Sequence, residues 1–518
     1  MFKKSFTSGA LILIVSGLIV RAMGFIYRIY LSNLIGAEGM GLFQLIFPLY
    51  SLIILTLTSG ISISVSRMVA EELAKNHHAN LRRIMIYGLQ IVVSVSIAVA
   101  LVCFAYADFI SNSILKDWRT YYSLVLLIPC IPIIAAASAL KGYFYGIQEM
   151  IPTAISQIVE QIVRIGFVML TASWFLEAGL EYACAVATFG TALGEIANLI
   201  VLYSTYRFGK QKIGKSIQRS LPIKKKKVYK ELIVTSMPIS FSRFITSALG
   251  AVETILIPAR LMAGGLSHHL AMEAFGKLVG MAMPLVFFPT VITSGLATAL
   301  VPAISKSVST KSFKAANYKI SRSIQLTLAL GIMFTVIFSC YPNQISNVIY
   351  RKDKIGGTLY LLSFTCVFLY LQQILIGILN GLGLQTISLW NSLIGSILRI
   401  GFVYYYIPIY GIRGYIWGIV ISSAMVCVLN MLAIMKETGL LMDFKNWVFK
   451  PGIIGVVMAI CSKYIYSFFI IFHVSGEWTI FMTLTANVFI AVELMMLVGM
   501  LGKGKKTMAK SIFRSLYR

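Results

Sequence analysis

Charge is scarce in this chain, and acidic charge is the scarcest kind. Only 12% of the 518 residues are charged, and 18 acidic residues stand against 45 basic ones. Hydrophobic residues make up 58% of the sequence and the mean hydropathy is +0.84, which leaves too little polar surface for a soluble globule. The composition therefore indicates an integral membrane protein. We interpret the net charge of +27 as a signal of membrane orientation and expect no nucleic-acid partner, because Lys and Arg gather in short loops.

Residues typical of metal and redox chemistry are also few. The seven cysteines are scattered singly, which favours small buried side chains over disulfides or a zinc site. The adjacent pairs His77-His78 and His268-His269 are expected to be solvated loop residues, because neighbouring side chains diverge and make poor metal sites. No phosphate-cradling loop is predicted, so we expect no ATP hydrolysis. The chain is therefore expected to hold no metal or cofactor.

Long apolar runs dominate what remains. Runs of about 20 residues, each long enough to cross a bilayer as a helix, recur about fourteen times. We expect membrane spans near 9–33, 41–65, 84–106, 120–140, 152–175, 182–205, 231–256, 278–301, 322–341, 358–379, 387–408, 412–435, 449–471 and 478–502. The outward stretches 107–119, 257–277 and 342–357 have room for a short interfacial helix at most.

Two short motifs recur at one constant offset of 235 residues. Thr-Ser-Gly at 58–60 returns at 293–295, and Arg-Ile-Gly-Phe-Val at 164–168 returns at 399–403. The alternative is a chance match, since an apolar sequence uses few residue types. Five consecutive identities that include an Arg are nevertheless uncommon. The pattern indicates a duplicated unit, and parallel halves joined by a long connection are typical of transporters. We expect a lobe at 1–206, a basic cytoplasmic connection at 207–230, a second lobe at 231–436, an extra helix pair at 437–502 and a basic tail at 503–518.

The loop charges predict orientation. Basic residues gather in alternate connections, whereas the opposite loops hold more acids. The basic segments are Lys3-Lys4, 67–83, Lys141, the central run 207–230, 306–322, 436–450 and 503–518. We therefore expect both termini of a cell-membrane protein to lie in the cytoplasm.

The first span carries two arginines on one helical face. Gly17, Arg21, Gly24 and Arg28 follow 4-3-4 spacing, so both guanidinium groups align about 10 Å apart. Two permanently charged, planar guanidinium groups at this separation suit a phosphate or pyrophosphate ligand. The alternative is that Arg28 reaches the membrane interface and Arg21 pairs with a carboxylate.

Further charges lie within predicted spans, where each costs about 2.5–3.5 kcal/mol at mid-helix. Glu160 and Arg164 stand four residues apart, so a structural ion pair competes with a substrate contact. Arg399 repeats Arg164, but Gly395 takes the place of Glu160. The other members of this set are Arg243, Glu195, Glu253 and Glu493. The acids are candidates for exchanging a proton or binding sodium, and the alternative is that they balance nearby arginines.

Several motifs resemble the stage V sporulation protein B family. They are 11–14 with 21–25 and Arg28, 36–42, 132–134, 142–148, 156–157 with 160–165, 181–183, 301–306 and 380–385. The resemblance covers most of the chain and weakens from Pro451 onward. The family belongs to the superfamily of multidrug, oligosaccharidyl-lipid and polysaccharide flippases.

The resemblance implies an all-α polytopic protein of about 14 spans. Two pseudo-symmetric six-helix lobes would face each other in a V, and the C-terminal helix pair would form a groove for a lipid tail. It also implies that Arg21, Arg28 and Arg67 face a central cavity. Related lipid II flippases have a cation early in the eighth helix, where this sequence offers only Lys277 near the outer edge.

These observations lead to the hypothesis of a flippase rather than an enzyme. The expected cargo is an undecaprenyl-pyrophosphate-linked peptidoglycan precursor for spore cortex synthesis, driven by sodium, protons or the membrane potential. The alternatives are another lipid-linked polysaccharide, a cation-coupled drug exporter, and a membrane scaffold for cell-wall synthesis proteins. An enzyme would need an outward carboxylate such as Glu38, Asp108 or Asp117.

Overall fold

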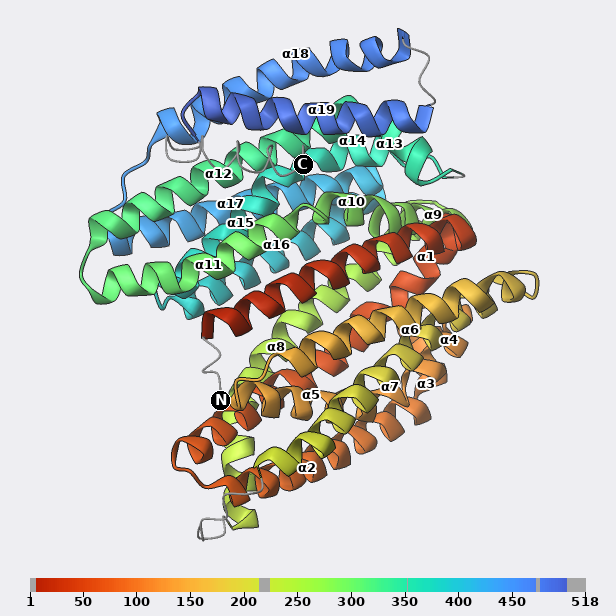
Figure 1. Cartoon of the computed structure of the whole chain (residues 1–518). Helices are drawn as coiled ribbons and strands as arrows, with labels where there is room; N and C mark the ends of the chain where they lie inside the picture. Colours follow the sequence, from red (N-terminus) through yellow and green to blue (C-terminus); the bar gives the residue numbers. More distant parts are fainter. Residues whose placement is uncertain (1–5, 214–223, 352, 472–475, 501–518) are drawn as a thin grey trace, which may run out of the picture. The chain divides into compact units, whose positions relative to one another are not determined.

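The computed structural model describes residues 6–213, 224–351, 353–471 and 476–500 (Figure 1). Every regular element in these ranges is helical, which confirms the all-α fold. The helices are α1 (Phe6–Ala74), α2 (His78–Ala105), α3 (Ala107–Phe109), η1 (Ile110–Ile114), η2 (Trp118–Thr120), α4 (Tyr121–Leu127), α5 (Cys130–Gly146), α6 (Ile151–Leu176), α7 (Leu180–Ile213), α8 (Lys225–Ala263), α9 (His268–Phe275), η3 (Gly276–Ala282), α10 (Met283–Phe287), α11 (Thr290–Ser309), α12 (Phe313–Cys340), α13 (Pro342–Ile349), α14 (Gly356–Ser363), α15 (Thr365–Gly381), α16 (Gln385–Tyr410), α17 (Ile412–Thr438), η4 (Lys445–Phe449), α18 (Lys450–Ile471) and α19 (Gly476–Leu497).

The number of membrane spans agrees with the sequence prediction. Within the described ranges, 12 helices are long and apolar enough to cross a bilayer, and the number is up to 14 when two bent pairs each count as one span. One pair, Trp118–Leu127 with Cys130–Gly146, bends by 42°, and the other, Gly356–Ser363 with Thr365–Gly381, bends by 49°. The chain is a multi-pass membrane protein.

The helix ends repeat with the 235-residue offset of the sequence motifs. α2 covers residues 78–105 and α12 covers residues 313–340, so both ends are displaced by 235. The same displacement relates α5 to α15, and it relates α3 with η1 to α13. The two bends coincide as well, because Pro129 and Phe364 occupy equivalent places. Chance matching does not explain coincident helix ends, so the structure supports the duplication.

The first two predicted spans correspond to the two helical segments of α1, which is broken between them. The bend between them lies at Gly36, whose φ of 68° is left-handed and therefore favours glycine. Close contacts follow directly, because a Cβ on Gly41 would collide with the carbonyl oxygen of Met272 in α9. Two further glycines in this region, Gly276 and Gly280, pack against Ala37 and Met40.

The span predicted at 278–301 begins earlier and is interrupted. α9, η3 and α10 run together from His268 to Phe287, and α11 starts afresh at Thr290. Pro289 separates them because it has no N–H group to continue the helical hydrogen bonds. The preceding stretch, 257–277, is also more than a surface loop, since α8 continues to Ala263 and α9 buries Phe275 completely.

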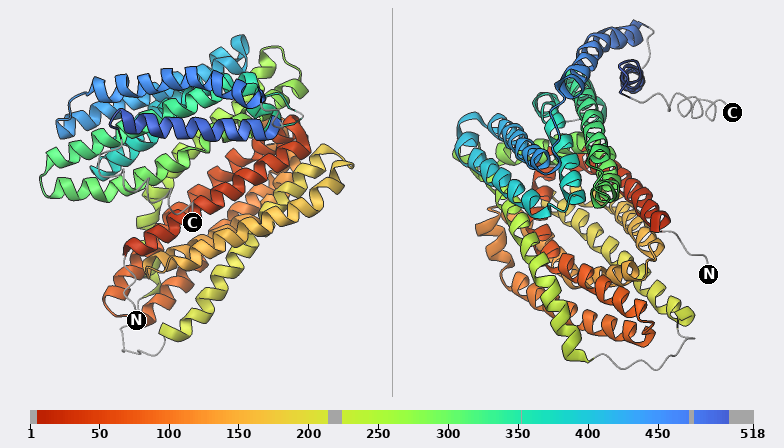
Figure 2. Two further views of the ribbon diagram at one scale, coloured as in Figure 1. Left: turned by 45° about the horizontal axis from the view of Figure 1, so that its top comes forward. Right: turned by 90° about the vertical axis from the view of Figure 1, so that its left-hand side faces the viewer.

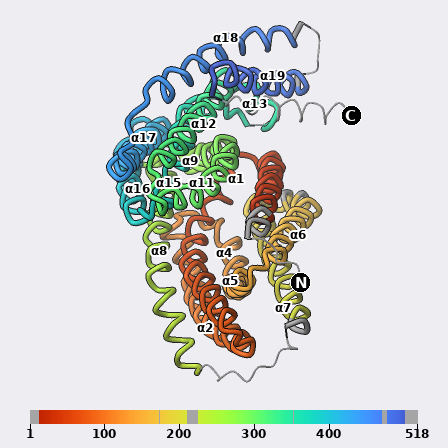
Figure 3. Tube along the Cα trace, turned by 60° about the vertical axis from the view of Figure 1, so that its left-hand side comes forward, coloured from red at the N-terminus to blue at the C-terminus, as the bar shows by residue number. Residues whose placement is uncertain are grey.

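The chain folds into two compact units, Met1–Gly280 and Met281–Arg518. In the first unit α1 packs on α5, α6 and α8, and α6 and α7 lie side by side (Figure 3). The contact of α1 with α8 is close at Gly60, where an added Cβ would meet Ser236 and Ser240. The division into lobes at 1–206 and 231–436 stays a prediction.

In the second unit α11, α12, α15 and α17 surround an apolar core, and α18 and α19 pack on α12 (Figure 2). A buried polar cluster attaches this last helix pair. The side chain of Asn487 donates to the hydroxyl of Tyr341 at 3.3 Å and accepts from Ser462 at 2.6 Å. Within the second unit, these bonds join the extra helix pair to the C-terminal end of α12.

The segment before η4 carries a helix-capping carboxylate outside the spans. The backbone N–H of Asn446 donates to Asp443 at 3.1 Å, and the Asn446 side chain also donates to this carboxylate. These bonds lower the pKa of Asp443 from its ordinary value.

Three predicted basic segments, namely Lys3-Lys4, part of the central run (214–223) and the tail 503–518, lie outside the described residues.

Candidate functional site

The densest polar cluster inside the membrane joins α6 to α7. Arg164 donates from Nη2 to Oε1 of Glu160 at 2.7 Å, so the predicted ion pair is present. Asn198 donates from one amide nitrogen to Glu160 at 3.2 Å and to Glu195 at 3.2 Å. One buried amide therefore bridges two carboxylates from different helices, beside a single guanidinium group.

Local sequence explains how the two helices approach so closely. Pro152 lies in the first turn of α6, where the missing N–H costs nothing, and the polar residues then follow at three- and four-residue steps. Gly194 of α7 faces the backbone of Glu160, because a Cβ at that position would lie 2.9 Å from the Glu160 carbonyl oxygen. The glycine lets Glu195 and Asn198 reach the carboxylate of Glu160.

α1 adds two tyrosines with buried hydroxyl groups, Tyr27 and Tyr50, beside this cluster. The Tyr50 hydroxyl lies in the electrostatic field of Glu195, Arg164 and Glu160, and Tyr27 lies in the field of Arg164. Neither hydroxyl has a hydrogen-bond partner among the described residues, and the same holds for Nε of Arg164 and Oδ1 of Asn198. Buried polar atoms without protein partners require water or a ligand, so this cluster has unused capacity to bind a small polar species.

The second half replaces this charged cluster with a neutral one. Asn430 stands 235 residues after Glu195 and accepts a hydrogen bond from Asn391 at 2.8 Å. Arg399, the counterpart of Arg164, donates to the hydroxyl of Ser396 at 3.2 Å, and Gly395 stands where Glu160 would be. The two halves share a fold, but only the first carries paired carboxylates at this level.

Three of the predicted arginines are solvent-accessible in the first unit. Arg21 on α1 is exposed, and added Cβ atoms on the neighbouring Gly17 and Gly24 would meet nothing within 4 Å. Arg243 is exposed in the middle of α8, 18 residues from Lys225, and no described carboxylate forms an ion pair with it. Arg67 pairs with Glu71 at 2.8 Å near the end of α1. Arg28 is half-buried beside Tyr27.

The remaining predicted acids lie on other helices. Glu253 is buried in α8, and Glu493 is exposed on α19 in the other unit. Lys277 pairs with Glu273 at 2.5 Å within the α9–η3 segment. Within the described ranges, no group of three His, Cys, Asp or Glu side chains is arranged to hold a metal ion.

A second charged cluster was not anticipated. Arg119 donates to Glu38 at 2.8 Å and to Asp117 at 2.9 Å, while His269 contacts Glu38 at 3.2 Å and His268 contacts Asp117 at 3.4 Å. Both histidines are solvent-exposed as predicted, but they begin α9 rather than lying in a loop, and each contacts a carboxylate. Residues so distant in sequence give no local signal, although every one of them is a charged or titratable residue in an otherwise apolar chain.

One sequence expectation also needs correction. Gly209 to Ser216 has the letter spacing of a phosphate-cradling loop, contrary to the expectation that no such pattern occurs. Its first part, through Ile213, continues α7, and 214–216 lie outside the described residues. A nucleotide loop of this type follows a strand and opens a helix, so the pattern here lacks the required context.

Comparison with known proteins extends these observations. The family described as "Polysaccharide biosynthesis protein" matches residues 6–266. Stage V sporulation protein B of Bacillus subtilis (strain 168) is 32% identical over 90% of this chain and 91% of its own length. The chain belongs to the stage V sporulation protein B family. The family described as "MatE" matches residues 238–405, and the lipid II flippase MurJ of the same organism is 25% identical over 76% of this chain and 75% of its own length.

Solved structures show the same fold. A lipid II flippase MurJ in an inward closed conformation has a TM-score of 0.69 at 13% identity, and the match covers 97% of this chain and 99% of that one. An inward-facing multidrug resistance transporter of the MATE family and MOP superfamily has a TM-score of 0.66 at 14% identity, covering 82% of this chain and 98% of the transporter. The family and the fold are thus those of membrane transporters.

Proposed function

We propose that the chain is a flippase for an undecaprenyl-pyrophosphate-linked peptidoglycan precursor, which it moves to the outer leaflet for spore cortex synthesis. The precursor and the sporulation role extend to this chain what the names of its relatives say of those proteins. Both termini lie in the cytoplasm in this proposal, in agreement with the distribution of Lys and Arg among the loops.

The observation that carries the proposal is the exposure of arginines deep in the helices of the first unit. Arg243 lies about 27 Å from the start of α8, at 1.5 Å per residue, and so lies within the membrane. A guanidinium group at that depth is too costly to face hydrocarbon, so Arg21 and Arg243 line an aqueous space. Planar guanidinium groups bind phosphate by two parallel hydrogen bonds, which fits a pyrophosphate head and opposes a cationic drug.

Transport in this proposal is alternating access. The arginines proposed to bind the headgroup replace its hydration while the lipid tail remains in the bilayer; they are Arg21, Arg28, Arg67, Arg164, Arg243 and Arg399. The two lobes rock about the connection 207–230, and binding must differ between the two states for a driving force to produce net movement. No cofactor takes part.

Coupling is assigned to the cluster of Glu160 and Glu195. The two carboxylates share one amide donor and one nearby arginine, so removing or adding a cation changes the local balance of charge. Sodium and protons both fit two carboxylates with the unpartnered Tyr50 hydroxyl beside them. Glu253 and Glu493 are secondary candidates, because they lie on α8 and α19 rather than on α6 or α7.

Reconstitution tests the proposal directly. The purified chain is placed in vesicles with a fluorescent lipid II, and movement between leaflets is followed with imposed sodium, proton or potential gradients. Transport by the wild type that falls at least tenfold in Arg243→Ala supports the flippase and its cavity. Export of cationic dyes without lipid movement would favour a drug exporter. Polymerised sugar would indicate an enzyme, and no movement of either cargo would favour a scaffold.

A further inference from the structure

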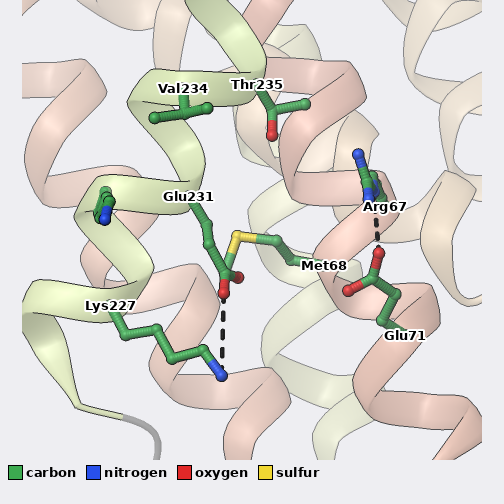
Figure 4. A pocket seen from close by; sticks show the side chains of 8 residues that line it. Arg67, Met68, Glu71, Lys227, Glu231, Val234 and Thr235 are labelled. Atoms are coloured by element: carbon green, nitrogen blue, oxygen red, sulfur yellow. Dashed lines mark hydrogen bonds and ion pairs between the residues drawn. The ribbon is translucent and has the colours of Figure 1, made fainter.

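A second cationic site lies at the predicted cytoplasmic ends of α1 and α8. A groove of about 500 Å³ separates the two helices there (Figure 4). Its lining residues are Arg67, Met68 and Glu71 from α1, and Lys227, Lys230, Glu231, Val234 and Thr235 from α8. The volume falls in the range of about 300–1,000 Å³ typical of small-molecule sites. Both helices belong to the first compact unit.

The cationic side chains on the two walls are held only by weak ion pairs, so they can bind a ligand instead. Arg67 pairs with Glu71 at 2.8 Å, and Lys227 pairs with Glu231 at 3.8 Å, each within its own helix (Figure 4). All four side chains are at least 40% exposed. Exposed pairs of this kind contribute only about 0.2–1 kcal/mol, so a multivalent anion competes easily for the two cations.

Lys230 gives the groove a net positive charge, which favours an anionic ligand. It lines the same groove, and no described carboxylate forms an ion pair with it. The groove therefore has three cations against two carboxylates. Lys225, only a few residues earlier, lies 5.2 Å from the ring centroid of Tyr229 and is not among the lining residues. The lysines of the central basic run thus divide into members that line the groove and members that do not.

An apolar stripe leads away from the charged end. Val234, Met237 and Phe241 follow three- and four-residue steps on α8 and are 63%, 68% and 63% exposed. On α1, the exposed Ile63 lies one helical turn before Arg67. Charge at one end and a continuous apolar face beyond it match the layout of a lipid, with an anionic head and a hydrocarbon tail.

We propose that this groove is a loading site that binds the diphosphate headgroup of a polyprenyl lipid at the cytoplasmic surface before the headgroup reaches Arg21 and Arg243, which lie deeper along α1 and α8. Two walls of positive charge suit two linked phosphates, with Arg67 on one and Lys227 with Lys230 on the other. This inference rests on the proposed function and extends it, because Lys227 and Lys230 are not among the six arginines proposed above to bind the headgroup, although Arg67 is.

The test compares two double variants that remove the same charge from the same basic run. Lys227→Gln with Lys230→Gln neutralises the groove, whereas Lys224→Gln with Lys226→Gln neutralises exposed lysines that do not line it. Binding of undecaprenyl pyrophosphate to the full chain is measured by native mass spectrometry at fixed salt. Phosphatidylglycerol and inorganic pyrophosphate serve as separate probes.

We expect the groove variant to weaken undecaprenyl pyrophosphate binding at least tenfold and the matched variant to weaken it less than twofold. Equal weakening in both variants would overturn the site in favour of diffuse surface charge. Equal affinity for phosphatidylglycerol would show a general lipid contact, and tight binding of inorganic pyrophosphate alone would show a free-anion site. The vesicle assay on the wild type separates failure of this site from failure of the flippase proposal.

Discussion

Nη1 of Arg119 lies 2.8 Å from Oε1 of Glu38, although 81 residues separate them. Glu38 follows the bend of α1 at Gly36, and Arg119 lies just before α4. Both side chains are at most 20% exposed, and His269 contacts the other oxygen of Glu38. Together with His269, the pair therefore connects three segments of the first unit that are distant in sequence, namely α1, η2 and α9.

Arg119→Ala should destabilise this region. The change leaves Glu38 and Asp117 without their shared guanidinium group, and we expect a loss of about 2 kcal/mol, below the 3–5 kcal/mol of fully buried pairs because some solvent reaches both. Thermal unfolding in detergent measures the loss. Arg351→Ala is the control, since its pair with Glu477 is mostly exposed and should contribute almost nothing. Equal melting temperatures of the two variants would contradict the connecting role.

Gly276→Ala should be strongly destabilising, whereas Gly24→Ala should not. A Cβ on Gly276 would collide with the carbonyl oxygen of Ala37, whereas a Cβ on Gly24 meets nothing within 4 Å. Alanine is favoured over glycine inside a helix by about 1 kcal/mol, so Gly24→Ala should be neutral or slightly stabilising. Melting curves of both variants check the prediction, and tolerance of Gly276→Ala would show that α9 can move away from α1.

Arg164→Ala should be more harmful alone than together with Glu160→Gln. The single change leaves the carboxylates of Glu160 and Glu195 without the arginine that balances them, and the second change removes one of those charges. We expect the double variant to recover at least about 1 kcal/mol of the stability lost. A double-mutant cycle of unfolding measures this coupling, and additive effects would contradict the ion-pair account.

Glu195→Gln should uncouple transport from its driving ion, whereas Asn430→Ala should leave coupling intact. The two positions are equivalent in the duplication, but only Glu195 carries a charge. Vesicle assays with and without a sodium or proton gradient measure the dependence directly. Retained gradient dependence in Glu195→Gln would place coupling outside the α6–α7 cluster.

The sequence predicted the helical fold well, because the length of an apolar run is a local property of the chain. The motif offset predicted a duplication that the helix ends of α2 and α12 support. Prediction was poorer at proline, because Pro289 interrupts the eighth predicted span. A run of apolar letters does not reveal where a helix bends or restarts.

Of the site, the sequence predicted the pair within one helix and missed the partners from others. Glu160 and Arg164 share a helix at four-residue spacing, so their contact follows from helical geometry alone. The bridge through Asn198 depends on how α6 and α7 pack, which no local pattern specifies. The Arg119 cluster likewise arises from tertiary packing.

The central claim is that arginines on α1 carry a lipid-linked pyrophosphate across the membrane. Leaflet accessibility of lipid II tests it most directly, in cells depleted of other flippases that express the wild type or Arg21→Ala with Arg28→Ala at equal abundance. We expect the wild type to restore outward exposure, the double variant to fail, and the Arg351→Ala control to behave as wild type. Restored exposure by the double variant, or none by the wild type, would contradict the account.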